Sequence, residues 1–110
     1  YALHHVFLSK DGVYVVAFDM TKLLKEDAIA LEFLRFWLNS VKLHAPLSPV
    51  VLVGTHGDKV SAKADLDTID RVLRDELKIA SEHKTVVPHP DGMNFFPVNN
   101  ASRSVHRAAA

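Results

Sequence analysis

Two short runs of almost wholly apolar residues restrict the possible folds of this chain more than any other feature. Residues 13–18 read Val-Tyr-Val-Val-Ala-Phe, and residues 50–53 read Val-Val-Leu-Val. A strand with one wet face alternates apolar and polar residues, whereas a strand covered on both faces, as in parallel sheets, is apolar throughout. We therefore predict two strands of a parallel sheet, near residues 13–19 and 50–54.

Helical periodicity follows each of these runs. Apolar residues recur three and four positions apart from about Glu26 to Leu43 and again from about Asp65 to Leu77, with Asp65 as a candidate N-cap. The apolar positions of the first helix are Leu31, Leu34, Leu38 and Val41, and the stripe is widened by Phe33, Phe36 and Trp37. The chain therefore alternates strands with helices, as parallel sheets require.

A third strand is predicted at residues 95–98, Phe-Phe-Pro-Val. Pro97 has no amide hydrogen to give, so we expect it at a sheet edge. The preceding loop, residues 87–94, is rich in Pro and Gly and is expected to turn as a small hairpin at Asp91-Gly92. The order β-α-β-α-β predicts a three-layer α/β domain, with a parallel sheet in sequential strand order and helices on its faces.

Composition excludes several classes of function. The chain has 110 residues, enough for one domain, and its 13 basic and 13 acidic residues cancel, so no net field draws it to nucleic acid or anionic lipid. The absence of cysteine excludes disulfides, thiolate metal sites and cysteine nucleophiles. The apolar runs are too short to span a membrane, and we expect a cytoplasmic protein. Tyr1 is not a natural start, so we expect a piece of a longer protein.

Two loops lie where open α/β sheets bind ligands, at the carboxyl ends of strands. Residues 54–59, Gly-Thr-His-Gly-Asp-Lys, follow the second strand, and residues 99–102, Asn-Asn-Ala-Ser, follow the third. The Asp58 carboxylate can accept two parallel hydrogen bonds from a base with two adjacent N–H donors, which guanine has and adenine lacks. The small Ala101 would let a backbone N–H approach a carbonyl oxygen of the base. The two loops could thus hold a guanine between them.

These residues also carry a family resemblance. Residues 50–58, Val-Val-Leu-Val-Gly-Thr-His-Gly-Asp, resemble the fourth signature of Ras-like GTPases, Asn-Lys-x-Asp, in the Thr-His-x-Asp form of Roc domains. Those are the G domains of the Roco proteins, which include the leucine-rich repeat kinases. Tyr1–Leu8 resembles the segment after the Asp-x-x-Gly switch, where we expect a helix, and Phe95–Ser102 resembles the fifth signature. Residues 1–110 would then be the C-terminal part of one Roc/Ras-like G domain, the second half of a P-loop GTPase fold.

The resemblance implies roles for individual residues. Asp58 would bind the guanine edge, His56 stands where Ras proteins have a lysine whose stem lies over the base, and Thr55 would brace the loop. The implied guanine-binding residues are Thr55, His56, Asp58, Asn100, Ala101 and Ser102, with the Ala101 N–H meeting the guanine carbonyl. The intact domain would bind GTP or GDP with Mg²⁺. This chain has no Gly-x-x-x-x-Gly-Lys-Ser/Thr, switch I threonine or Asp-x-x-Gly, so we expect no catalytic residue and no metal ligand in it.

Simpler interpretations compete with these. Residues 54–58 could be a tight turn capped by Asp58, and residues 100–102 an ordinary helix N-cap. Asp19 is expected to start a solvated loop, and the charges of helix 65–77 to form a wetted face. The seven histidines show no metal-binding spacing on a predicted helix, and His4 and His5 are expected on the surface of a switch-region helix.

Two functions of the parent protein remain open. It could be a GTP-binding molecular switch with slow hydrolysis, in which this chain supplies base recognition, or an inactive G-domain scaffold for dimerisation or assembly. A weaker third hypothesis is an unrelated flavodoxin-like module. The missing half of the domain would leave one edge of strand 13–19 open, so we expect a second copy or that half-domain along it. The family also implies a neighbouring COR-type domain.

Overall fold

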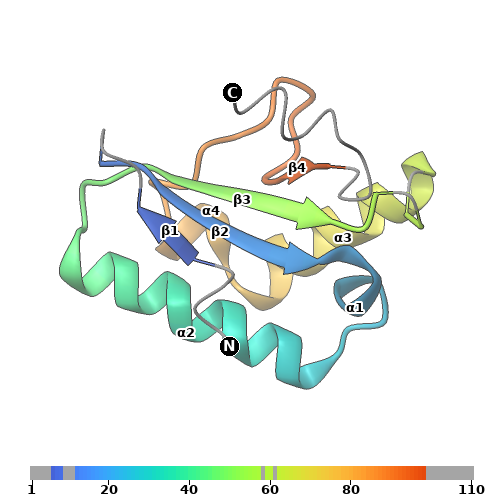
Figure 1. The fold of residues 1–110 in the computed structure, drawn as a ribbon, viewed down its shortest axis with the longest axis horizontal. Helices are drawn as coiled ribbons and strands as arrows, with labels where there is room; N and C mark the ends of the chain where they lie inside the picture. The colour runs from blue at the N-terminus through green and yellow to red at the C-terminus, as the bar shows by residue number, and fades with distance from the viewer. Residues whose placement is uncertain (1–5, 9–11, 58, 61, 99–110) are drawn as a thin grey trace.

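The computed structural model describes residues 6–8, 12–57, 59–60 and 62–98. They form one four-stranded sheet with helices packed against it (Figure 1). The strands, in spatial as well as sequence order, are β1 (Val6–Leu8), β2 (Tyr14–Asp19), β3 (Val50–Thr55) and β4 (Phe96–Pro97). The helices are α1 (Met20–Leu24), α2 (Ala28–His44), α3 (Lys63–Glu76) and α4 (Ile79–Glu82).

The predicted parallel core is confirmed. β2 pairs with β3 in parallel from Tyr14↔Val50 to Asp19↔Thr55, and β3 pairs with β4 in parallel at Val53↔Phe96 and Gly54↔Pro97. Pro97 lies in the last strand of the described sheet, at the edge where a residue without an N–H is tolerated. The result is a small mixed α/β domain whose sheet is mostly parallel.

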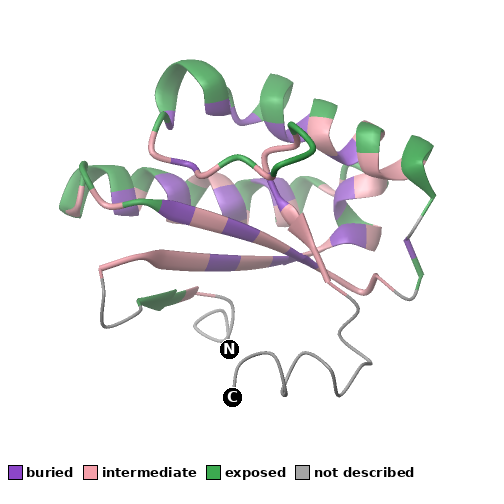
Figure 2. Cartoon of the chain, turned by 90° about the horizontal axis from the view of Figure 1, so that it is seen from above, coloured by how far each residue is buried: buried purple, intermediate pink, exposed green. Residues whose placement is uncertain are grey.

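The predicted three layers are not found among the described residues. Viewed along the sheet, α2, α3 and α4 lie on the same side of the strands, so the described part has two layers (Figure 2). The reason is geometric, because parallel crossovers are right-handed and both connections step in the same direction, which puts their helices on the same face. Burial follows this arrangement: Val16 and Phe18 of β2 are buried, whereas Val15 and Ala17, on the other face, are half-buried.

The helix starts show where local signals succeed and fail. α2 begins after Asp27, whose carboxylate accepts hydrogen bonds from the Ile29 and Ala30 amides at 2.9 and 3.1 Å. The prediction that Asp65 caps α3 was wrong, because the helix begins two residues earlier, after Ala62, which has no capping side chain. Asp65 instead lies in the first turn, where a negative charge is favourable against the helix dipole.

The helix predicted at Tyr1–Leu8 was wrong for its described part. Residues 6–8 form β1, which pairs antiparallel with β2 from Val6↔Val16 to Leu8↔Tyr14. Pairing with β1 satisfies backbone groups that β2 would otherwise leave open, and it covers the first half of the edge that we expected a second copy to occupy. His4 and His5 lie outside the described residues.

The loop before β4 is anchored to α3 by Asp70, a residue of the helix face that we expected to be solvated. Asp70 of α3 accepts hydrogen bonds from the backbone and side-chain amides of Asn94 at 2.8 and 3.0 Å. The side chain of Asp70 is 13% exposed, so it is a structural anchor and the prediction for this residue was wrong. At Asp91-Gly92 the chain makes a turn closed by the His89 N–H to the Met93 carbonyl, without strands on either side.

One hydrophobic cluster joins the helices to the buried face of the sheet. Its fully buried large side chains are Phe95, Met20, Leu23, Leu34, Leu38, Leu52, Ile69, Leu73 and Val16. Gly54 of β3 lies directly under this cluster, and a Cβ there would come within 2.6 Å of Met20 Cγ and 3.2 Å of Phe95 Cδ2. Only glycine therefore lets Met20 pack against the end of β3. Among the described residues, no helix is both long enough and apolar enough to cross a bilayer.

Candidate functional site

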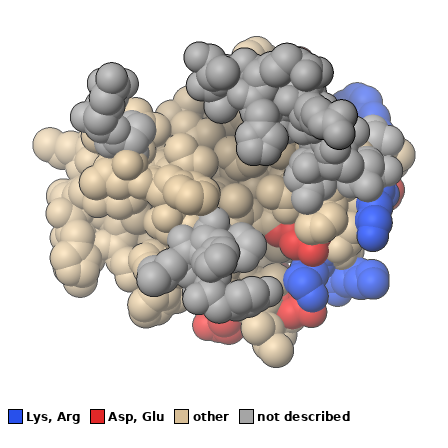
Figure 3. Space-filling model, viewed as in Figure 1, with Lys and Arg blue, Asp and Glu red and all other residues tan. Residues whose placement is uncertain are grey.

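The carboxyl ends of β2 and β3 meet at one rim of the sheet. Asp19 and Thr55 are register partners there, and α1 begins directly after Asp19. The Asp19 carboxylate caps α1 by accepting hydrogen bonds from the Thr21 amide at 2.9 Å and the Thr21 hydroxyl at 2.7 Å. Charged side chains visible in Figure 3 gather toward this end of the strands.

Asp19 is held as an anion. Burial acts to raise its pKa, but the hydrogen bonds from Thr21 and the positive charges of His56 and Lys22 outweigh burial, so that the pKa lies below its ordinary value. Asp19 was expected to start a loop, but α1 begins directly after it and Asp19 is its N-cap. The signal in the sequence was local: an Asp two residues before a Thr, at the end of a strand and the start of a helix, is an N-cap pattern.

Thr55 ties the loop after β3 to the end of β2. Its hydroxyl donates a hydrogen bond to the Phe18 carbonyl at 3.0 Å, and its oxygen lies 3.2 Å from His56 Nδ1. These contacts join the loop to the neighbouring strand, and the role of Thr55 in a guanine site stays a prediction.

His56 has a backbone conformation that is unusual for its residue type. Its φ is +68°, in the left-handed region, and its ring nitrogen Nδ1 lies 3.2 Å from Asp19 Oδ1. A non-glycine residue in that region costs on the order of 1–3 kcal/mol and persists only where surrounding contacts fix it. Here, Asp19 and Thr55 provide those contacts. Glu26 and Lys78 also have positive φ values, so the contacts of His56 with Asp19 and Thr55, together with its backbone, make this rim a candidate site.

The two predicted loops start side by side. The Val98 amide donates to the Gly54 carbonyl at 2.8 Å, and the Gly57 amide donates to the Val98 carbonyl at 2.9 Å. After Gly57 the first loop turns back, and the amides of Lys59 and Val60 both donate to the His56 carbonyl. Val60 is buried and anchors the turn. Of the predicted guanine-binding residues, Asp58, Asn100, Ala101 and Ser102 lie outside the described residues.

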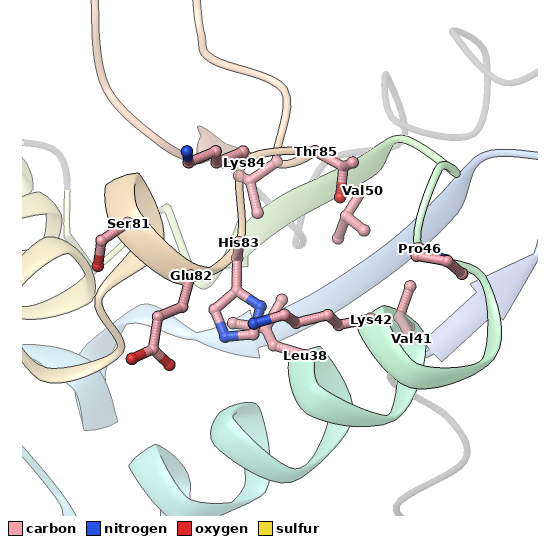
Figure 4. Close-up of a pocket in the computed structure, with 11 residues that line it drawn as sticks. Leu38, Val41, Lys42, Pro46, Val50, Ser81, Glu82, His83, Lys84 and Thr85 are labelled. Atoms are coloured by element: carbon pink, nitrogen blue, oxygen red, sulfur yellow. The ribbon is translucent and has the colours of Figure 1, made fainter.

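A hollow of about 260 Å³ lies at the opposite end of β3, between the end of α2 and α4 (Figure 4). His83 projects into it beside Lys42 and is 6% exposed. Burial, together with the positive charge of Lys42, lowers the pKa of His83, although Glu82 opposes the shift. Sequence reasoning did not identify this histidine. In the described ranges, no group of three or more His, Asp or Glu residues could hold a metal ion.

Comparison with known proteins finds several relatives that are described as serine/threonine-protein kinases. The chain is 39% identical over 61 residues to the probable serine/threonine-protein kinase pats1 of Dictyostelium discoideum and 38% identical over 58 residues to its probable serine/threonine-protein kinase roco8, alignments that span 56% and 53% of the chain. It is 27% identical over 110 residues, 94% of the chain, to leucine-rich repeat serine/threonine-protein kinase 1 of Caenorhabditis elegans.

These similarities concern a small part of each relative. The chain spans only 2%, 3% and 4% of the lengths of these three proteins, in the same order. No protein-family profile matches the chain. No solved structure matches it. Over about 60 residues, the chain is thus related to Roco and leucine-rich repeat kinases.

Proposed function

We propose that this chain is the guanine-recognition half of a Roc-type, small-GTPase-like domain, and that its parent is a GTP-binding switch that hydrolyses GTP slowly. The observation that carries the proposal is the pair of backbone hydrogen bonds that join Val98 to Gly54 and Gly57. They hold Val98, the last described residue before 99–102, beside Gly54 and Gly57. This contact supports the proposal that the two loops act together on one base.

In this proposal the two loops divide the recognition of the base. Asp58 accepts hydrogen bonds from the two adjacent N–H groups of guanine, and the Ala101 amide donates to its carbonyl oxygen, with Asn100 and Ser102 shaping the loop. Thr55 and Asp19 fix the backbone and ring of His56 at the edge of the site. His56 itself has a left-handed φ of +68° directly after β3.

The relationship to Roco and leucine-rich repeat kinases supports the proposal. In the resemblance described above, the Thr-His-x-Asp pattern belongs to the G domains of that family, and here it follows a strand whose neighbours are parallel. We assign no step of GTP hydrolysis to this chain, because phosphoryl transfer relies on a phosphate cradle, a lysine and a bound magnesium ion. The chain alone should therefore bind GTP barely and not hydrolyse it.

Base specificity in the longer protein that contains this chain tests the proposal. Asp58→Asn presents an amide donor where the acid presents an acceptor, so preference should shift from guanosine toward xanthosine nucleotides. Each hydrogen bond to the charged carboxylate should be worth roughly 1.5–3 kcal/mol. Competition binding with GTP and XTP measures the shift, with Asp75→Asn on the exposed side of α3 as the matched control. Unchanged guanine preference in Asp58→Asn would remove Asp58 from this role.

A second candidate function is a catalytically inactive G-domain scaffold that mediates dimerisation or assembly. The observation that favours it is the exposed apolar surface of α2, where Ile29, Phe36 and Leu43 are 82%, 61% and 77% exposed. The two functions differ in whether the parent binds GTP at all. Calorimetry on the parent, titrated with GTP in the presence of Mg²⁺, separates them: tight binding supports the switch, and absent binding supports the scaffold.

A further inference from the structure

Two side chains contact the ring of His56 at the same nitrogen. Asp19 Oδ1 and Thr55 Oγ1 each lie 3.2 Å from His56 Nδ1. The parallel register explains why they meet, because Asp19 and Thr55 are paired residues of β2 and β3, and His56 follows Thr55 directly. One atom of the ring is therefore contacted from the ends of both strands.

Neither of these two oxygens has a proton to give to Nδ1. The Thr55 hydroxyl has a single hydrogen, which it donates to the Phe18 carbonyl at 3.0 Å. Asp19 is held as an anion, and an ionised carboxylate only accepts hydrogen bonds. An unprotonated Nδ1 would direct its lone pair at both oxygens. The ring of His56 therefore carries a proton on Nδ1, whatever the state of its second nitrogen.

The Asp19 carboxylate is itself fixed in place. Its Oδ1 accepts hydrogen bonds from the Thr21 amide at 2.9 Å and from the Thr21 hydroxyl at 2.7 Å. A helix N-cap needs an acceptor for backbone amides and no contact across the sheet. Asp27 caps α2 with bonds of this kind, from the Ile29 and Ala30 amides. Capping therefore accounts for the contact of Asp19 with Thr21 but not for its contact with His56.

The second ring nitrogen of His56, Nε2, remains for a ligand. The His56 side chain is 36% exposed, and Nε2 has no hydrogen-bond partner among the described residues. No described side-chain nitrogen is both buried and unpartnered, so Nε2 is open to solvent. The position of the ring proton decides what a histidine offers to a ligand. A binding group is most effective when its neighbours lock its orientation.

We propose that Asp19 is a positioning residue of the nucleotide site: with Thr55, it holds the His56 ring in one orientation with a proton on Nδ1, so that Nε2 is the nitrogen presented to the guanine nucleotide. This inference rests on the proposed function, because it needs a guanine nucleotide at the loop after β3. Asp19 acts through His56 and does not itself touch the nucleotide. A free imidazole in water favours the proton on Nε2, so loss of Asp19 should redistribute the ring proton.

Nitrogen NMR of the 110-residue chain locates the ring proton, at a pH high enough for neutral histidine rings and with His56→Gln to assign the signal. Wild type should carry the proton on Nδ1. Asp19→Ser keeps a capping oxygen but is too short to reach His56, so the proton should move toward Nε2. Asp19→Asn keeps an acceptor oxygen, held by the Thr21 amide, and should retain the wild-type form. A wild-type ring with its proton on Nε2 would overturn the proposal, as would an Asp19→Ser ring unchanged from wild type.

The affinity of the longer protein for GDP tests the role of Asp19 in binding. Asp19→Ser should weaken GDP binding about three- to tenfold, because His56 loses the neighbour that orients it, and Asp19→Asn should restore most of the loss. Asp27→Ser is the matched control, since it makes the same change at the cap of α2 and should leave the affinity at the wild-type value. Equal losses in Asp19→Ser and Asp27→Ser would mean that Asp19 is only a cap and would overturn the proposal. Failure of guanine recognition itself is distinguished by Asp58→Asn, which would then leave the base preference unchanged.

Discussion

The two ends of β3 are built on different principles. At the carboxyl end, Thr55, His56 and Asp19 contact one another, and His56 has a strained backbone. At the amino end, Val50 borders a hollow beside His83, a buried histidine in a neutral-favouring environment. The hollow of about 260 Å³ therefore does not coincide with the contacts among Thr55, His56 and Asp19. The contacts among Thr55, His56 and Asp19, which join two strands at one rim, indicate the candidate site.

The largest loss of unfolding free energy is expected from a change in the packing under the carboxyl end of β3. Gly54→Ala would place a Cβ 2.6 Å from Met20 Cγ, and Met20 is fully buried, so the core must shift. Overpacking of this kind costs roughly 1–3 kcal/mol of unfolding free energy, measurable by urea denaturation. Gly92→Ala is a useful control, because its Cβ would meet nothing within 4 Å and its cost comes only from a φ of +96°. Equal losses in the two variants would show that Met20 does not constrain the end of β3.

At the amino end of β3, we expect an effect of pH on the free energy of unfolding. The pKa of His83 is lowered by burial and by Lys42, so below its ordinary value of 6.5 the unfolded chain takes up a proton that the folded chain resists. The contribution of His83 to stability is therefore complete above that pH and is lost as the pH falls toward the folded pKa. Urea denaturation at several pH values between 5 and 8 measures the slope.

Two variants identify the histidine as the source of this slope. His83→Gln should lose the part of the pH dependence that His83 causes, and Lys42→Met should reduce it, because one of the two causes of the lowered pKa is gone. If His83→Gln kept the full slope of wild type, the titrating group would lie elsewhere in the molecule.

The sequence predicted those strands and helices that a local apolar pattern determines. The strands found at residues 14–19 and 50–55 and the helices found at 28–44 and 63–76 lie within a few residues of their predicted bounds, because each carries its own apolar period. β1 was missed because a three-residue strand exists only through its pairing with β2. The placement of the described helices α2, α3 and α4 on one face was missed because the handedness of two successive crossovers, rather than composition, decides it.

In the candidate site, too, the local pattern was predictable and the long-range contacts were not. The Gly-Thr-His-Gly-Asp loop was found by its place after an apolar strand. Its contact with Asp19 was not, because His56 and Asp19 are far apart in sequence and meet only through the parallel register of β2 and β3. The anchor between Asp70 and Asn94 was missed for the same reason. Contacts between residues that only the sheet brings together cannot be predicted from a short stretch of sequence.

The smallest change in unfolding free energy is expected from His56→Gly. Together with a second variant at this residue, it tests whether the left-handed backbone of His56 is strained. His56→Gly removes the cost of the left-handed φ but also removes the ring contacts and adds freedom to the unfolded chain, so the net change in unfolding free energy should stay within about 0.5 kcal/mol. His56→Val keeps the left-handed requirement and adds a branched Cβ that tolerates it poorly, which should cost about 1–2 kcal/mol. Both variants lack the imidazole, so the difference between them, measured by urea denaturation, reports the left-handed cost together with the extra unfolded-state freedom of glycine. A valine variant as stable as the glycine variant would mean that residue 56 is free to leave the left-handed region, and strain would then no longer distinguish this end of β3 from the other.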